Sequence, residues 1–485
     1  MSLLWRLASR AGPAALLAMV LHLYLQRRQA AKEKAARALT MNLPGTLGSY
    51  WLGETLAFAA AMREFERERF ARYGNAFYTH VAGKNVVFVA DRASADFVYK
   101  APETLIQAGT FDTFQALMKD SVLLMTGRDH RQSRLQITKV LSDAQLDANL
   151  RVLQDVFGDK LRAWRGPVEM HSALKDVLFT GACRVLFGLD AELFGTVVRT
   201  LKDLSAVYGK GFFALPVDLG DYSEFGRALQ AREQLVLFIR ELAVRRRSQP
   251  DMYKQGAPDL LQLLLDLRNE DGGVDDVDRV ASNAQTLLFG ATDTTASLVA
   301  HALLRLHENP AVLDRVRAEF QSTLGTGPLP AATLQALKLP FVDAVLRECL
   351  RLRPPFASGT WRTAVADVTL PSGYVVPRGW MISVAMDFPQ NHDAEAFPEP
   401  DAFYPNRFLP TGSSAAHADF DGALNPFGRG AHGCPGKGFA LAEAKLLLAL
   451  IVLRPNKAFP RLVAVPQKWC DKPAHEAAEG MEMIF

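Results

Sequence analysis

Apolar residues recur at helical spacing along most of the chain. The longest such pattern runs from Val277 to Glu308 and predicts a helix of about 32 residues, because acids precede it and Asn309-Pro310 follow it. Through residues 287–291 this segment is apolar on nearly all sides, so we expect the helix to be buried.

Two stretches have the composition of strands instead. Residues 76–91 are aromatic and β-branched around a turn at 82–85, which predicts a hairpin. Residues 368–384 predict a second group of short strands, because Pro- and Gly-containing turns interrupt them. The polar, Gly- and Pro-rich stretches 248–258 and 269–276 are expected to be loops. The pattern therefore indicates a mainly α fold with a minor antiparallel β region.

The first 42 residues differ from the rest and are predicted to be a leader with a basic linker. Residues 11–25 are apolar apart from His22. This apolar run is shorter than the roughly 20 residues that span a bilayer. The first 40 residues hold seven bases and one acid, whereas the rest of the chain is net negative. Bases that follow the apolar run favour a membrane anchor with the body in the cytoplasm.

A single-pass anchor of this kind predicts a protein of the endoplasmic reticulum membrane. The Ala- and Arg-rich, acid-poor composition leaves a plastid or mitochondrial transit peptide open as the alternative. Leu43-Pro44-Gly45 then reads as a hinge into one large domain, residues 43–485. This body is nearly neutral, which argues against a nucleic-acid-binding protein.

Four polar residues interrupt the long apolar helix: Thr292, Asp293, Thr294 and Thr295. A buried carboxylate is costly unless it has a partner or a chemical role. Threonine hydroxyls can bond to the carbonyl four residues earlier, and with Gly290 nearby they can bend the helix. The patch is either a polar packing contact or a groove that delivers protons beside a ligand.

Residues 425–440 carry the second chemical signal. Five glycines lie between Gly428 and Gly438, and they let a flat ligand approach the main chain. Cys434 is followed by Pro435, a favourable first helical residue, and then by an apolar helix to about Leu450. A cysteine at a helix N-terminus is stabilised as thiolate. None of the four cysteines forms a CxxC pair, so no zinc knuckle or disulfide framework is indicated.

Phe427-x-x-Gly430-x-x-x-Cys434-x-Gly436 resembles the haem-binding loop of the cytochromes P450. Three other stretches, all earlier in the chain, resemble motifs of that family and occur in the family's order. Residues 290–295 resemble its oxygen-activating helix, with Ala291 where a second glycine is usual. Glu348-x-x-Arg351 matches its Glu-x-x-Arg, and residues 405–408 match its later arginine motif, with Asn406 in place of an acid. The resemblance covers about residues 43–485.

The resemblance implies the cytochrome P450 fold and a heme b whose iron is bound by the Cys434 thiolate. It places Asp293 and Thr294 as the catalytic acid and hydroxyl that relay protons. It makes Glu348, Arg351 and Arg407 a structural triad, although Glu348 and Arg351 read alone are an i,i+3 pair worth a few tenths of a kcal/mol. It also implies a set of cofactor contacts, namely His130, Arg134, Arg362, Phe427, Gly428, His432 and Gly436.

The implied reaction is monooxygenation, in which one atom of O2 enters an apolar substrate. No GxGxxG motif opens a βα unit, so electrons from NADPH must arrive through a separate reductase or ferredoxin. A haem-thiolate isomerase or dehydratase acting on peroxides, or a haem sensor, is the alternative, and the Asp293-Thr294 pair argues against both. Arg131, Lys139, Arg429 and Lys437 are candidate docking bases for the electron donor.

Residues 52–58 and 83–87 resemble the group that contains retinoic-acid hydroxylases, plant steroid and terpenoid hydroxylases and cyanobacterial relatives. An isoprenoid-derived substrate is therefore expected: a terpenoid, retinoid or sterol. Lys119 is the one base between Lys100 and Arg128, which favours a neutral substrate over a carboxylic acid. The expected pocket residues are Phe111, Phe114, Phe289 and Ala291.

Overall fold

The structure is a computed structural model. It describes residues 13–249, 258–269, 271–325, 333, 336–356, 358–387, 394, 396–409, 424–454, 458–471 and 474–485. The chain divides into two compact units, each with its own buried apolar core. Unit 1 comprises Met1–Gly109 and Thr360–Ala385, and unit 2 comprises Thr110–Gly359 and Met386–Phe485.

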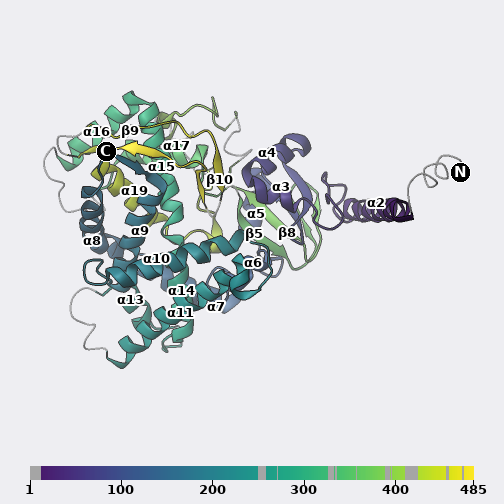
Figure 1. The fold of residues 1–485 in the computed structure, drawn as a ribbon, viewed down its shortest axis with the longest axis horizontal. Coiled ribbons are helices and arrows are strands. Elements are labelled where there is room, and N and C mark those ends of the chain that lie inside the picture. Colours follow the sequence, from purple (N-terminus) through teal and green to yellow (C-terminus); the bar gives the residue numbers. More distant parts are fainter. Residues whose placement is uncertain are drawn as a thin grey trace. The chain divides into compact units, whose positions relative to one another are not determined.

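Unit 1 is built on a five-stranded sheet in the order β1-β2-β8-β5-β3, of which β5 and β8 are labelled in Figure 1. Its strands are β1 (Ala76–Val81), β2 (Lys84–Val89), β3 (Ile106–Ala108), β5 (Ser358–Ala364) and β8 (Met381–Ala385), with β6 (Val368–Thr369) and β7 (Val375–Val376) forming a separate pair. Its helices are α2 (Pro13–Leu39), α3 (Thr55–Ala60), α4 (Met62–Tyr73) and α5 (Arg92–Lys100).

The predicted hairpin and the second strand group are both present in unit 1. The hairpin turn is tighter than expected, because Ala82 and Gly83 alone connect β1 to β2 and both have positive φ. The pairs β1–β2, β3–β5 and β6–β7 are antiparallel as expected, whereas β2 and β8 run parallel. The long stretch of chain between these two strands permits such a crossover.

Unit 2 is mainly helical. Its helices are α6 (Asp112–Leu117), α7 (Gly127–Val140), α8 (Asp143–Arg162), α9 (Met170–Phe187), α10 (Gly195–Lys210), α11 (Glu224–Ser248), α13 (Leu260–Asp266), α14 (Val277–Gly290), α15 (Asp293–Glu308), α16 (Pro310–Leu324), α17 (Pro340–Leu352) and α19 (Lys437–Val452). Short 3₁₀ segments are η1 (Gly211–Phe213), η2 (Gly220–Tyr222), η4 (Pro405–Phe408) and η5 (Gly430–His432). Small sheets comprise β4 (Pro167–Glu169), β9 (Arg461–Leu462), β10 (Trp469–Asp471), β11 (His475–Ala477) and β12 (Glu482–Ile484).

The predicted long helix is present from Val277 to Glu308, but it is interrupted in the middle. α14 ends at Gly290 and α15 begins at Asp293, which leaves Ala291 and Thr292 as a turn. Among the described residues it is also the one helix long and apolar enough to cross a membrane. Two thirds of its apolar window is buried, so here it serves as a core helix.

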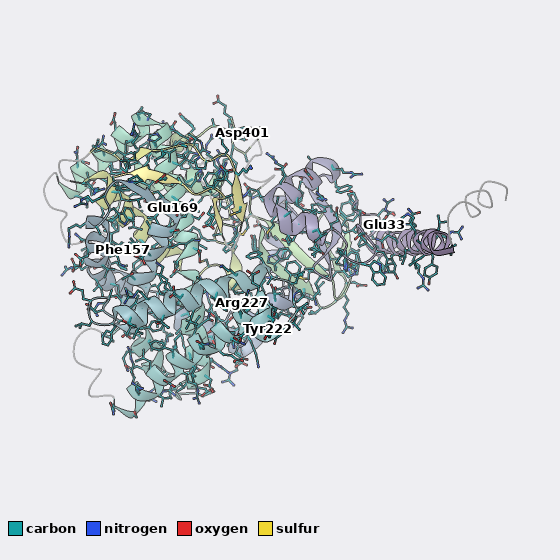
Figure 2. All side chains as sticks on the ribbon, in the orientation of Figure 1. Glu33, Phe157, Glu169, Tyr222, Arg227 and Asp401 are labelled. Atoms are coloured by element: carbon teal, nitrogen blue, oxygen red, sulfur yellow. The ribbon has the colours of Figure 1, made fainter. Side chains whose placement is uncertain are left out.

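The leader region is helical as far as Leu39, and its basic second half is docked rather than free. Within unit 1, the Thr46 hydroxyl donates to Glu33 Oε1 at 2.7 Å, and Gln29 Nε2 donates to the Gly48 carbonyl at 2.8 Å (Glu33 is labelled in Figure 2). Ala36 and Thr40 are buried. The region predicted as a basic linker is therefore part of the unit 1 fold.

The expected hinge at Leu43-Pro44-Gly45 is wrong. Leu43 is fully buried, and the Tyr78 amide of β1 donates to the Pro44 carbonyl at 3.0 Å. A Cβ on Gly45 would lie 2.1 Å from the Tyr78 carbonyl oxygen, so this glycine allows the backbone to approach the strand. The Leu-Pro-Gly sequence marks a close backbone contact instead of a flexible joint.

Candidate active site

The glycine-rich loop places Cys434 just before α19. The Cys434 amide donates to the Phe427 carbonyl at 2.7 Å, and the Gly428 amide donates to the Asn425 carbonyl at 3.1 Å. Gly428 and Gly430 have φ values of +63° and +69°, which residues with a Cβ rarely adopt. These two positions explain why the loop needs glycine.

α19 begins at Lys437, two residues later than the sequence predicted from Pro435. Burial raises the pKa of the Cys434 thiol, although the amides of Gly436 and Lys437 and the Arg134 guanidinium oppose that rise. The expected helix-terminus stabilisation of the thiolate is therefore present but is outweighed by desolvation. Coordination by a metal ion deprotonates such a thiol outright.

Three predicted cofactor contacts gather around this loop from two elements of unit 2. The imidazole rings of His130 on α7 and His432 on η5 stack with centroids 3.9 Å apart and an interplanar angle of 17°. Arg134, one helical turn after His130, donates to the Gly433 carbonyl. Burial lowers the pKa of this guanidinium, and the neighbouring Cys434 opposes the shift.

Arg362 lies in unit 1, on β5. Its guanidinium donates to the Trp361 carbonyl at 2.9 Å, and burial lowers its pKa. Because it belongs to the other unit, its role as a cofactor contact stays a prediction.

The polar patch of the long helix coincides with its interruption. Thr292 Oγ1 lies 3.5 Å from the Leu288 carbonyl, and Thr294 Oγ1 donates to the Gly290 carbonyl at 3.0 Å. These bonds to the carbonyl four residues earlier account for the loosened turn. Asp293 is the first residue of α15, and its carboxylate is 2.7 Å from the ammonium of Lys175 on α9. Lys175 was not foreseen from the sequence, because 118 residues separate it from Asp293.

The triad predicted from the two arginine motifs is assembled and buried. Arg351 binds both oxygens of Glu348, at 2.8 and 2.9 Å, and Arg407 Nε binds Glu348 Oε1 at 3.1 Å. All three side chains are at most 4% exposed. Glu348 and Arg351 are thus not the surface pair that their spacing alone suggests. Removing one partner of a buried ion pair lowers the free energy of unfolding by about 3–5 kcal/mol.

The triad also holds a stretch of main chain. Arg351 donates to the carbonyls of Pro400 and Ala402, and Arg407 donates to the carbonyl of Pro398. Asn406, which replaces an acid in the motif, accepts a 2.7 Å bond from Arg315 of α16. The substitution therefore keeps a contact with a cation.

Two of the expected pocket residues meet in an aromatic cluster of unit 2. Phe114 of α6 and Phe289 of α14 both contact Phe212, with centroids 4.6 and 4.8 Å away. Tyr208 lies 5.3 Å from Phe289, and Phe213 lies 5.8 Å from Phe114. Tyr208, Phe212 and Phe213 were not predicted as pocket residues from the sequence, although the two phenylalanines after Gly211 could have indicated an aromatic cluster. Of the other expected residues, Phe111 is buried before α6 and Ala291 lies in the turn of the long helix.

Comparisons with known proteins identify the family of this chain. The family model described as cytochrome P450 matches residues 43–468. The chain belongs to the cytochrome P450 family. This P450 is 31% identical to human cytochrome P450 26C1 over 492 residues, which cover 93% of this chain and 90% of that protein. It is 30% identical to putative cytochrome P450 120 of Synechocystis sp. over 415 residues, covering 84% and 89%.

The fold agrees as well. A solved structure described as retinoic acid bound cyanobacterial CYP120A1 matches this P450 with a TM-score of 0.81 and 26% sequence identity, covering 91% of this chain and 98% of that chain. The family makes the enzyme a monooxygenase that uses haem-thiolate iron, O2 and electrons from NADPH.

The residues of the loop fit that cofactor. The Cys434 residue is partly open to solvent although neighbouring protein groups desolvate its thiol, and this sulfur is a soft ligand of the kind that iron takes. Arg134 and the stacked His130 and His432 lie beside it as donors of the kind that haem carboxylates require.

Proposed function

We propose that this P450 hydroxylates an extended, apolar, isoprenoid-derived molecule. The observation that carries the proposal is the aromatic cluster of Phe114, Phe212 and Phe289. Phe289 lies near the end of α14, four residues before Asp293, the first residue of α15. Aromatic side chains favour flat, apolar ligands. A structural relative described as retinoic acid bound supports the same substrate class.

In this proposal each site residue has a distinct task. Cys434 would hold the haem iron through its thiolate, and haem bound there would supply the oxygen activation and electron transfer. His130, Arg134, Arg362 and His432 hold the charged edge of the cofactor, while Phe427, Gly428 and Gly436 shape the loop around it. Asp293 takes up a proton, and the Thr294 hydroxyl passes it toward the substrate side of the site as a general acid.

The proposed substrate is neutral. Lys119 is exposed, and Arg232 of α11 binds the main chain of its segment. Arg232 donates to the carbonyls of Leu117 and Lys119 at 2.9 and 2.7 Å. The Nε–Nη2 edge of this guanidinium is therefore occupied by backbone carbonyls rather than presented to a carboxylate. An alcohol, aldehyde or hydrocarbon of the isoprenoid class therefore fits better than an acid.

Two further parts of the proposal concern partners. A separate reductase or ferredoxin supplies the electrons, and Arg131, Lys139, Arg429 and Lys437 are its candidate docking bases. The apolar residues before Arg27 anchor the enzyme to the endoplasmic reticulum membrane, with the body in the cytoplasm. In this proposal α2 includes the end of the anchor and continues out of the membrane as one helix to Leu39.

The test compares a matched isoprenoid alcohol and acid, such as retinol and retinoic acid. Binding is followed by the spin-state shift of the ferric enzyme, and turnover is followed with reductase and NADPH. We expect the alcohol to bind more tightly and to yield a hydroxylated product. Tighter binding of the acid, together with loss of that preference in Lys119→Met, would contradict the neutral substrate. Absence of product from every isoprenoid tested, with a reductase that reduces the iron, would contradict the substrate class.

A further inference from the structure

Lys175 joins the proposed proton-relay acid to a second carboxylate. Its ammonium lies 2.7 Å from Asp293 Oδ1 and 2.7 Å from Glu476 Oε2. The three residues come from α9, α15 and β11, which pack together within unit 2 (α9 and α15 are labelled in Figure 1). Each side chain is about one quarter exposed. The cluster therefore holds one positive and two negative charges at the edge of the protein, where solvent can exchange protons with it.

The position of Asp293 keeps its carboxylate away from Thr294. Neighbouring residues on a helix do not face each other. Asp293 points to α9 and β11, whereas the Thr294 hydroxyl is bonded to the Gly290 carbonyl of its own helix. Proton transfer between the two therefore depends on how firmly Lys175 holds Asp293 and on how readily Asp293 takes up a proton.

The charges around Asp293 decide how readily its carboxylate takes up a proton. Burial alone would lower the pKa of Lys175, but Asp293 and then Glu476 raise it above its usual value, so the lysine stays cationic. An adjacent ammonium favours the ionised form of a carboxyl group, and an adjacent carboxylate disfavours it. Lys175 and Glu476 thus act on Asp293 in opposite directions.

We propose that Lys175, held by Glu476, is a positioning residue that sets the protonation state and orientation of Asp293 during proton delivery. The inference rests on the proposed role of Asp293. Glu476 then has an indirect effect on Asp293, because the Glu476 carboxylate binds the same Lys175 ammonium and weakens the ion pair between Lys175 and Asp293. Neither residue belongs to the four sequence motifs of the site.

Other titratable groups on the elements around α15 define the controls. On α9, His171 lies one turn before Lys175, with its ring 3.6 Å from Glu169 (labelled in Figure 2), and Asp176 is paired with Lys160 and Lys202. On α19, burial raises the pKa of Glu443 to about 8. On β11, His475 pairs across the hairpin with Asp471.

Several other charged residues of the packed elements have contacts of their own. They are Lys445 with Asp343, the Glu348 triad on α17, Arg315 with Asn406, Arg317 with Asp314, Glu319 with the amides of Phe341 and Val342, and Asp278 with Arg240. Because none of these contacts includes Asp293, changes at Lys175 and Glu476 should act on it separately.

The experiment titrates the Asp293 carboxyl in the ferric holoenzyme by infrared spectroscopy, with the band assigned by its loss in Asp293→Asn. Lys175→Met should raise the pH at which the protonated band disappears by about one unit or more, because the ammonium is lost and Glu476 remains. Adding Glu476→Gln to Lys175→Met should reverse part of that rise. Product formed per NADPH, measured against pH, should shift in the same direction as the band.

Matched variants separate this effect from general damage. Lys175→Arg should restore the wild-type titration, since it keeps the cation. Lys202→Met breaks a comparable lysine–carboxylate pair on the neighbouring residue of α9 and should leave the Asp293 band unchanged. His171→Gln should also leave it unchanged, which excludes the histidine as the titrating neighbour.

Two failures are distinguishable. If Asp293→Asn lowers the product yield but Lys175→Met leaves the Asp293 titration where it was, the inference about Lys175 is overturned while the role of Asp293 stands. If Asp293→Asn leaves the product yield per NADPH unchanged, the proposed relay role of Asp293 is overturned, and with it the inference.

Discussion

The Thr294 hydroxyl donates to the Gly290 carbonyl at 3.0 Å, so its oxygen lone pairs can accept a proton from elsewhere. Thr294→Ala removes the hydroxyl of the proposed relay and leaves the Cys434 loop unchanged. We expect retained haem and substrate binding, but roughly tenfold or greater loss of product per NADPH, with the missing electrons appearing as hydrogen peroxide.

A threonine elsewhere on the same helix is the control. Thr286 of α14 donates to the Ser282 carbonyl at 2.9 Å in the same pattern, outside the interrupted turn. Thr286→Ala should keep its coupling. Equal coupling in both variants would place the proton relay away from Thr294.

At the residue scale, the sequence supplied the members of continuous motifs and missed their distant partners. The resemblance of short motifs to the cytochrome P450 family pointed to Cys434, His432 and Glu348, because each motif is a continuous piece of chain. The partners of Lys175 lie in segments separated by as many as 301 residues, and only the fold brings them together. Burial of Glu348 was missed for the same reason, since η4 and the 398–402 segment cover it from elsewhere in the chain.

At the scale of elements, α2 shows where sequence composition misleads. Its bases suggested a linker, yet Gln29, Glu33 and Thr40 pack into unit 1. A helix that is polar in sequence can still dock by specific hydrogen bonds, and periodicity does not report these. By contrast, the break at Ala291 and Thr292 was foreseeable, because its cause is the local threonine run.

Two truncations should therefore behave differently. Deletion of residues 1–25 removes the apolar run and keeps the docked part of α2, so we expect a folded, haem-loaded protein that no longer sediments with membranes. Deletion of residues 1–40 also removes the Glu33 and Ala36 contacts, and we expect its melting temperature to be lower by at least about 2 °C. Calorimetry at a fixed scan rate measures the difference. Equal melting temperatures of the two truncated proteins would show that docking of α2 adds no stability. If the protein without residues 1–25 still sediments with membranes, another surface, such as that around exposed Trp51, anchors it.

For the whole molecule, the fold class and the family follow from the sequence, because long buried helices and four ordered motifs constrain both. The parallel pairing of β2 with β8 and the contacts of the Pro44 segment do not follow from it, since pairing of distant strands depends on the complete chain.

The central claim is that Cys434 is the thiolate ligand of a haem monooxygenase. The reduced protein with carbon monoxide tests it most directly. Cys183 and Cys349 are buried thiols whose pKa values burial raises, and neither lies in a glycine-rich loop. We therefore predict that the wild-type enzyme gives the red-shifted Soret band of thiolate-bound haem and that Cys434→Ala does not. The same red-shifted band in Cys434→Ala would contradict the account.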